Sequence, residues 1–161
     1  MPLSSPTLSS GLQNIGFPST HADAGNIWAA KYAAYAADAI SPMGGAPASL
    51  AAAEATLGAT LGAAFAAGSP ASVISAFVNG LTAFWLAPPV VFAGTPPGAV
   101  TLVGGAPALG PALSATFASN IAGKLSKQAC SDAIAAVLDT FTRTVIVTHP
   151  VVPTPVVGPI S

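Results

Sequence analysis

The side chains that most often carry chemistry are scarce in this chain. Its only histidines are His21 and His149, and Cys130 is its only cysteine. A nucleophilic Cys130 with His149 as its base would need a catalytic signature, which the surrounding sequence does not have. Two widely separated histidines without a cysteine pair do not make the pattern of a zinc site either. We therefore expect no metal site and no catalytic cysteine.

Asp132 and Asp139 are the best candidates for a carboxylate pair, because residues seven apart lie on one face of a helix. Lys127 and Arg143 stand four or five residues from them. Ion pairs along a helix surface explain this spacing better than acid–base catalysis does. The sequence accordingly predicts no enzyme, no catalytic residue, no cofactor and no small-molecule substrate.

Low charge is the most informative property of the chain. Only 6% of the 161 residues are charged, the net charge is −1 and the mean hydropathy is +0.70. Four Lys and Arg cannot make the basic surface that nucleic acid requires. A free monomer with so little charge would be poorly soluble. We expect much of the surface to be covered by other subunits or, as the alternative, by lipid.

The lipid alternative depends on the uncharged stretch from residue 55 to 123, which several prolines interrupt. A membrane-spanning helix needs about 20 continuous apolar residues. The helical pieces of this stretch are rich in Ala, Gly, Ser and Thr, which favour insertion only weakly. The N-terminus lacks the basic and apolar segments of a signal peptide. The sequence thus favours burial by protein over burial by lipid, in a protein made in the cytoplasm.

Hydrophobic spacing predicts a mainly α fold of about five helices with a small β-hairpin or strand element. The expected helices are 19–40, 49–67, 70–86, 107–121 and 126–142. Gly68 suits a helix end, and Ser69 followed by Pro70 suits a helix start. Valine-rich runs at 90–103 and 144–148 predict a hairpin and a strand.

The helical segments contain an apparent internal repeat. The pattern of Leu57, Gly58, Leu61 and Phe65 recurs as Leu109, Gly110, Leu113 and Phe117. We interpret this as a duplicated helix–helix–strand unit with halves at about 49–103 and 107–148, although chance similarity in an alanine-rich chain is the alternative. A single helical domain is expected at 19–149. The Ser/Pro-rich segment 1–18 and the Pro/Val-rich segment 150–161 are expected to be extended arms.

We expect the chain to assemble through apolar helix faces, strand edges and terminal arms. Uncharged strand edges usually pair with another strand, within the chain or between chains. Proline-rich arms lose little entropy when they are ordered on a neighbour. Deletion of 150–161 is therefore expected to weaken assembly without unfolding the helices. The candidate interaction residues are Val90, Val91, Phe92, Val145, Ile146, Val147, Val151, Val152, Val156 and Val157.

The Trp-Ala-Ala-Lys-Tyr-Ala-Ala-Tyr-Ala segment (28–36), the alanine-rich hairpin and the ending at 142–150 together resemble small structural proteins. These are the alanine-rich proteins of tailed-phage virions and phage-derived injection particles. The resemblance implies a structural subunit of a tail, neck, baseplate or capsid surface, located in the virion or assembled particle. Its partners would be other copies of itself and other structural proteins. A membrane-associated helical hairpin and a small binding or adaptor module are the alternatives.

Overall fold

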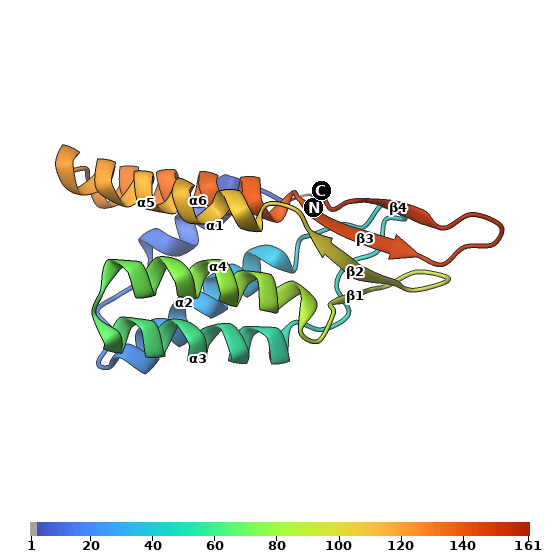
Figure 1. The fold of residues 1–161 in the computed structure, drawn as a ribbon, viewed down its shortest axis with the longest axis horizontal. Helices are drawn as coiled ribbons and strands as arrows, with labels where there is room; N and C mark the ends of the chain where they lie inside the picture. The colour runs from blue at the N-terminus through green and yellow to red at the C-terminus, as the bar shows by residue number, and fades with distance from the viewer. Residues whose placement is uncertain (1–2) are drawn as a thin grey trace.

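The computed structural model describes residues 3–161 (Figure 1). Within them, six helices accompany one antiparallel sheet with the strand order β1-β2-β3-β4. The predicted fold class, mainly α with a small β element, is confirmed. The elements are α1 (Ser5–Gln13), α2 (His21–Ala36), α3 (Ala51–Ala67), α4 (Pro70–Leu86), β1 (Val91–Phe92), β2 (Gly98–Val103), α5 (Ala106–Gly123), α6 (Lys127–Thr142), β3 (Val145–His149) and β4 (Val156–Pro159).

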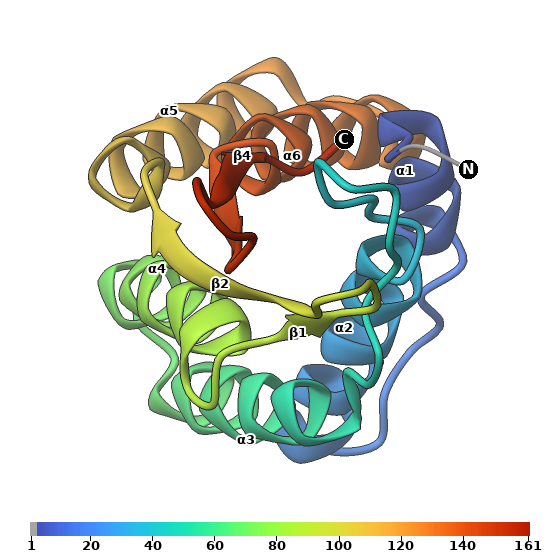
Figure 2. The same ribbon diagram turned by 90° about the vertical axis from the view of Figure 1, so that its right-hand side faces the viewer.

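The helices close into a ring in chain order, as the view along the molecule shows (Figure 2). Each helix packs against the next one in the sequence, and α1 closes the ring by packing on α6. The sheet stands at one end of this ring (Figure 1). We call this end the β-lobe, made of residues 40–50, 87–105 and 144–161. The molecule thus has a helical end and a β-sheet end.

Local signals set most helix boundaries. The Thr20 hydroxyl accepts the N–H of Asp23 at 3.0 Å and begins α2. The Ser69 hydroxyl accepts the N–H of Ser72 at 3.1 Å, with Pro70 in the first turn of α4. Gly68 ends α3 in the left-handed conformation at φ 71°. The predicted start of α4 and end of α3 are confirmed, because both depend only on neighbouring residues.

The prediction of an extended N-terminal arm at 1–18 is wrong for Ser5–Gln13, which forms α1. Pro6 lies in the first turn, where its missing N–H costs no helical hydrogen bond. Leu8 and Leu12 are one turn apart, and both are buried in the core. The Ser9 hydroxyl also donates to Asp132 of α6 across 2.5 Å. Packing on α6 therefore stabilises a helix whose composition is typical of an arm.

The C-terminal segment 150–161 is extended, but it belongs to the folded body and is not a free arm. Val156–Pro159 pairs with β3 as β4, and Ile160 is buried. Ser161 exchanges both backbone hydrogen bonds with Ile40, at 3.0 and 3.1 Å. The folded body therefore extends beyond the expected bounds of 19–149 at both ends.

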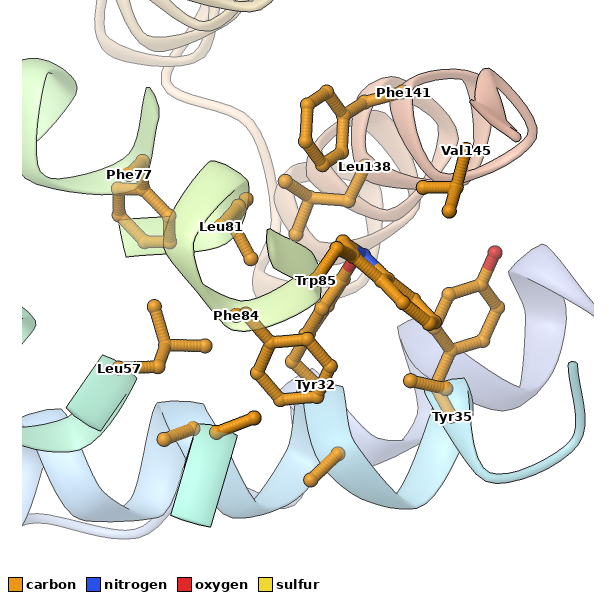
Figure 3. Close-up of a cluster of buried hydrophobic side chains, with 14 of the residues drawn as sticks. Tyr32, Tyr35, Leu57, Phe77, Leu81, Phe84, Trp85, Leu138, Phe141 and Val145 are labelled. Atoms are coloured by element: carbon orange, nitrogen blue, oxygen red, sulfur yellow. The ribbon is translucent and has the colours of Figure 1, made fainter. Parts of the chain in front are cut away.

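The core centres on aromatic residues of α2 and α4 that pack toward α6 (Figure 3). Tyr32, Phe84 and Trp85 lie in edge-to-face contacts with centroid distances of 5.1–5.3 Å. Their polar atoms form a chain: the Trp85 indole N–H donates to Tyr32 at 3.0 Å, and the Tyr32 hydroxyl lies 2.8 Å from that of Thr142. Thr142 donates in turn to the Leu138 carbonyl at 2.7 Å. No buried polar side-chain atom among the described residues lacks a partner.

Glycine allows α2 and α3 to approach at backbone distance. A Cβ on Gly25 would collide with the Gly58 carbonyl oxygen and the backbone of Gly62. Gly110, which corresponds to Gly58 in the second half of the proposed repeat, has more room, since a Cβ there would lie 3.5 Å from the Val78 side chain. Each half forms a helical hairpin followed by strands, α3–α4 with β1–β2 and α5–α6 with β3–β4. The duplication itself stays a prediction.

Candidate interaction surface

The predicted interaction residues divide between the core and the surface. Val90, Phe92, Val145 and Val147 are buried. Ile146, Val151 and Val156 are half-buried, whereas Val91, Val152 and Val157 are exposed. Strand alternation explains the division in β3, where every second side chain points into the core. The exposed and half-buried group is available to a partner without rearrangement.

The outer face of the sheet aligns apolar residues from all four strands. Strand register places Val91 beside Ala99, Ala99 beside Thr148, and Thr148 beside Val157. A second row joins Leu102, Ile146 and Pro159. Thr101 and Thr148 bond to each other through their hydroxyls at 3.0 Å, which occupies polar groups that would otherwise face solvent. We call these two rows the outer β-face.

Leu102 is the large apolar residue of the outer β-face that sequence reasoning missed. The register of β2 shifts between Val100 and Leu102, so Thr101 and Leu102 both face outward. Leu102 is consequently 56% exposed. Regular alternation would give these two neighbours opposite faces, and nothing in the valine-rich sequence marks the irregularity.

The strand edges, which the sequence offered as pairing sites, are covered within the chain. The strap, Ile40–Ala48, runs from β4 to β1 and turns the open sheet into a closed ring (Figure 2). At β1, the Ala48 N–H donates to the Val91 carbonyl and the Ala93 N–H donates to the Ala46 carbonyl, both at 2.8 Å. At the other end, Ile40 pairs with Ser161. Pairing within the chain leaves the outer β-face as the available apolar surface of the β-lobe.

Every charged residue lies outside the β-lobe. There are nine of them, four Lys and Arg and five Asp and Glu, in a molecule whose total accessible surface is 7567 Å². They occur on helices or in the residues next to helix ends: Asp23, Lys31, Asp38, Glu54, Lys124, Lys127, Asp132, Asp139 and Arg143. The β-lobe also presents Val152, 90% exposed, on its β3–β4 turn. One end of the molecule is therefore uncharged and partly apolar.

The α5–α6 hairpin carries a second apolar surface. A groove of about 340 Å³ is formed by residues of α5, α6 and the segments next to them, and small residues line most of it together with Leu109 and Phe141. Toward the tip, Ile121 is 79% exposed and Leu125 is also exposed. Ile121 follows the buried Leu109 and Leu113 at intervals of four residues, which predicts one shared helix face, but it lies near the end of α5, where the α5–α6 tip extends past the other helices (Figure 1).

The two carboxylates considered for catalysis, Asp132 and Asp139, both lie on α6 and form hydrogen bonds with two different helices, α1 and α2. Asp132 accepts from Ser9 and from Gln128, and these hydrogen bonds lower the pKa of its carboxyl. Asp139 accepts from Tyr35 and pairs with Arg143 at 2.9 Å, which confirms the predicted ion pair on that helix. Lys127 donates to the Ile15 carbonyl at 3.0 Å instead of pairing with an acid. Both carboxylates thus have structural partners.

The histidines and the cysteine are not brought together. Cys130 contacts the Leu125 carbonyl at 3.8 Å, whereas His149 lies in the β-lobe with hydrogen bonds to Ser41 and Pro96. His21 is exposed at the start of α2. Within residues 3–161 no three His, Cys, Asp or Glu side chains gather as metal ligands would.

The described helices include none whose length and apolarity would let it cross a membrane. Compared with protein-family models, curated protein sequences and solved structures, the chain shows no match to any of them.

Proposed function

We propose that the protein is a non-catalytic structural subunit of a multi-protein particle, such as a phage virion, and that it assembles through the outer β-face. The observation that supports this most is the gathering of exposed apolar side chains on a lobe with no charged residue. Single exposed apolar residues are ordinary, but a continuous apolar surface favours contact with another protein. Its partners would be other copies of the chain and other proteins of the particle.

The proposed mode of assembly uses a sheet face instead of strand edges. The strap occupies the edge of β1 and pairs with Ser161 beyond β4, so pairing with another chain at these places would first break backbone hydrogen bonds. The outer β-face needs no such change, because antiparallel pairing already fixes its residues. A rigid surface loses little conformational entropy on binding. Assembly through this face is therefore the cheaper route.

Light scattering on protein purified without detergent tests this proposal. We expect a defined oligomer, or a soluble species whose mass grows with concentration. Leu102→Lys places a charge on the outer β-face and should reduce the mass toward that of the monomer, because a lysine buried at an interface without a partner is costly. Ile121→Lys is the matched control, since it makes the same change of character at an exposed site on the helical end.

Three results would overturn the proposal. A chain that stays monomeric at every concentration, alone and with other proteins of its source particle, would favour a small binding or adaptor module. Loss of assembly in Ile121→Lys but not in Leu102→Lys would move the interface to the α5–α6 tip. Protein that leaves the membrane pellet only with detergent would favour the membrane-associated alternative.

A further inference from the structure

The one ionisable side chain of the β-lobe is fully buried. His149 ends β3, and its side chain points into the ring that the sheet and the strap enclose. Glycines fit around its imidazole: a Cβ on Gly98 would lie 2.5 Å from ring atoms, and one on Gly94 would lie 3.3 Å from them. The imidazole therefore occupies a close-fitting site on its β2 side.

The hydrogen bonds of His149 suit a neutral imidazole. Nδ1 lies 3.0 Å from the Pro96 carbonyl oxygen, which can only accept, so Nδ1 carries the ring proton. Nε2 of the neutral ring is then an acceptor, and the Ser41 hydroxyl donates to it at 3.0 Å. The Ser41 oxygen also accepts the Gly45 N–H at 3.2 Å. All these groups are satisfied as long as Nε2 has no proton.

A second proton on His149 would disturb this arrangement. Nε2 would become a donor, and the Ser41 hydroxyl proton would lose its acceptor. None of the residues around the new positive charge is itself charged. They are Ser41 of the strap, Pro96 of the β1–β2 turn, Gly94 and Gly98. The β4 partner of His149 is Val156, also uncharged. The charged residue nearest the strap in the sequence is Asp38, which forms no hydrogen bond with His149.

Ser41 is where this disturbance would reach the strap. Ser41 lies next to Ile40, which pairs with Ser161. Among the described residues, the hydroxyl of Ser41 makes the side-chain hydrogen bond that joins the strap to the sheet. The imidazole thus links β3, the β1–β2 turn and the strap. Without this link, two short stretches of backbone pairing hold the strap.

We propose that His149 is an acid-sensitive fastener whose protonation releases the strap Ile40–Ala48 and exposes the edge of β1 and the backbone of Ser161 beyond β4. A buried histidine whose protonation breaks its hydrogen bonds is one form of pH sensor. The released edge would offer unpaired backbone groups to a second strand. This inference is independent of assembly through the outer β-face, because strap opening is measured within one chain.

Amide hydrogen exchange combined with imidazole NMR tests the fastener in a His21→Gln protein, in which His149 is the remaining histidine. The amides to follow are those of Ile40, Ala48, Ala93 and Ser161. We expect their protection factors to fall about tenfold or more between pH 7.5 and 5.0. The pH midpoint of this fall should equal the pH midpoint of the change in the His149 imidazole chemical shift. Amides of α3, remote from the β-lobe, should keep their protection and serve as the internal control.

His149→Gln provides the matched variant, because a neutral amide side chain offers a donor and an acceptor but does not titrate in this range. We expect strap protection in this variant to be independent of pH. An imidazole that titrates without any change in strap protection would overturn the proposal, as would one that stays neutral to pH 5.0. The same pH dependence in His149→Gln would also overturn it. If His149→Gln does not fold, the His21→Gln protein alone still tests the proposal. Its strap protection and its imidazole chemical shift must change with the same pH midpoint.

Discussion

Tyr35 of α2 donates its hydroxyl proton to the Asp139 carboxylate of α6 across 2.5 Å. Arg143 pairs with the other oxygen of the same carboxylate at 2.9 Å and donates to the Leu3 carbonyl at 2.7 Å. One carboxylate therefore connects α2, α6 and the segment before α1. These elements meet where the chain closes the helical ring.

Replacing Asp139 with alanine should destabilise the protein by about 2–3 kcal/mol, since the buried Tyr35 hydroxyl would lose its acceptor. Urea unfolding measures this loss as a lower midpoint. Tyr35→Phe should cost less, because it removes the donor and leaves a carboxylate that Arg143 still pairs with. In the double variant the losses should not add, since each removes the same bond. Strictly additive losses would show that the two residues are not coupled.

Stability should fall at alkaline pH more steeply than in a Tyr35→Phe variant. Burial, followed by the hydrogen bond to Asp139, raises the pKa of Tyr35 well above its ordinary value, and burial likewise raises that of Tyr32. Groups with a raised folded pKa contribute full stability below the unfolded value of about 10 and lose it as pH rises above that value. The difference between the two urea midpoints, followed from pH 8 to 11.5, should therefore stay constant up to about pH 10 and narrow above it. Parallel curves for the two proteins would contradict this assignment.

Gly25→Ala should destabilise the protein by about 2 kcal/mol or more, because the added methyl collides with the backbone of α3. The control is Gly110→Ala in α5, where a Cβ meets only a side chain at 3.5 Å. That variant should be neutral, or more stable by up to about 1 kcal/mol, since alanine favours helix over glycine. Thermal unfolding of both proteins makes the comparison, and equal melting temperatures would argue against backbone contact between α2 and α3.

Deleting residues 150–161 should destabilise the whole fold, contrary to the expectation for a free arm. The deletion removes β4, the buried Ile160 and the pairing of Ser161 with the strap. Ile160→Ala alone should cost about 2–4 kcal/mol through the cavity it leaves. Val152→Ala, on the exposed turn of the same segment, should change stability by less than about 0.5 kcal/mol. A truncated chain with an unchanged unfolding midpoint would restore the arm interpretation.

The sequence predicts the helices from Thr20 onward well, because periodic apolar spacing and capping residues act over one or two turns. It fails at α1, where leucines one turn apart are stabilised by α6, more than a hundred residues away. A short segment rich in Ser and Pro carries no local signal of such distant packing.

The candidate surface was only partly predictable, for the same physical reason. Exposed Val91 and Val157 follow from a valine-rich sequence, but the burial of Val90 and Phe92 depends on tertiary packing. The strap has neither strand composition nor alternation, since Ser41–Ala48 is mainly Pro, Gly and Ala. Leu102 faces outward because of a register shift that involves two strands at once.

The pairing of Ile40 with Ser161 has a consequence for the order of folding during synthesis. The α2–α3–α4 part of the ring joins elements that are neighbours in the chain, and such local contacts form early. By contrast, α1 has no α6 to pack on until α6 has left the ribosome, and the Ile40 end of the strap waits for Ser161. The Ala46–Ala48 end of the strap can pair with β1 much earlier. The ring of sheet and strap therefore closes last at Ile40 and Ser161.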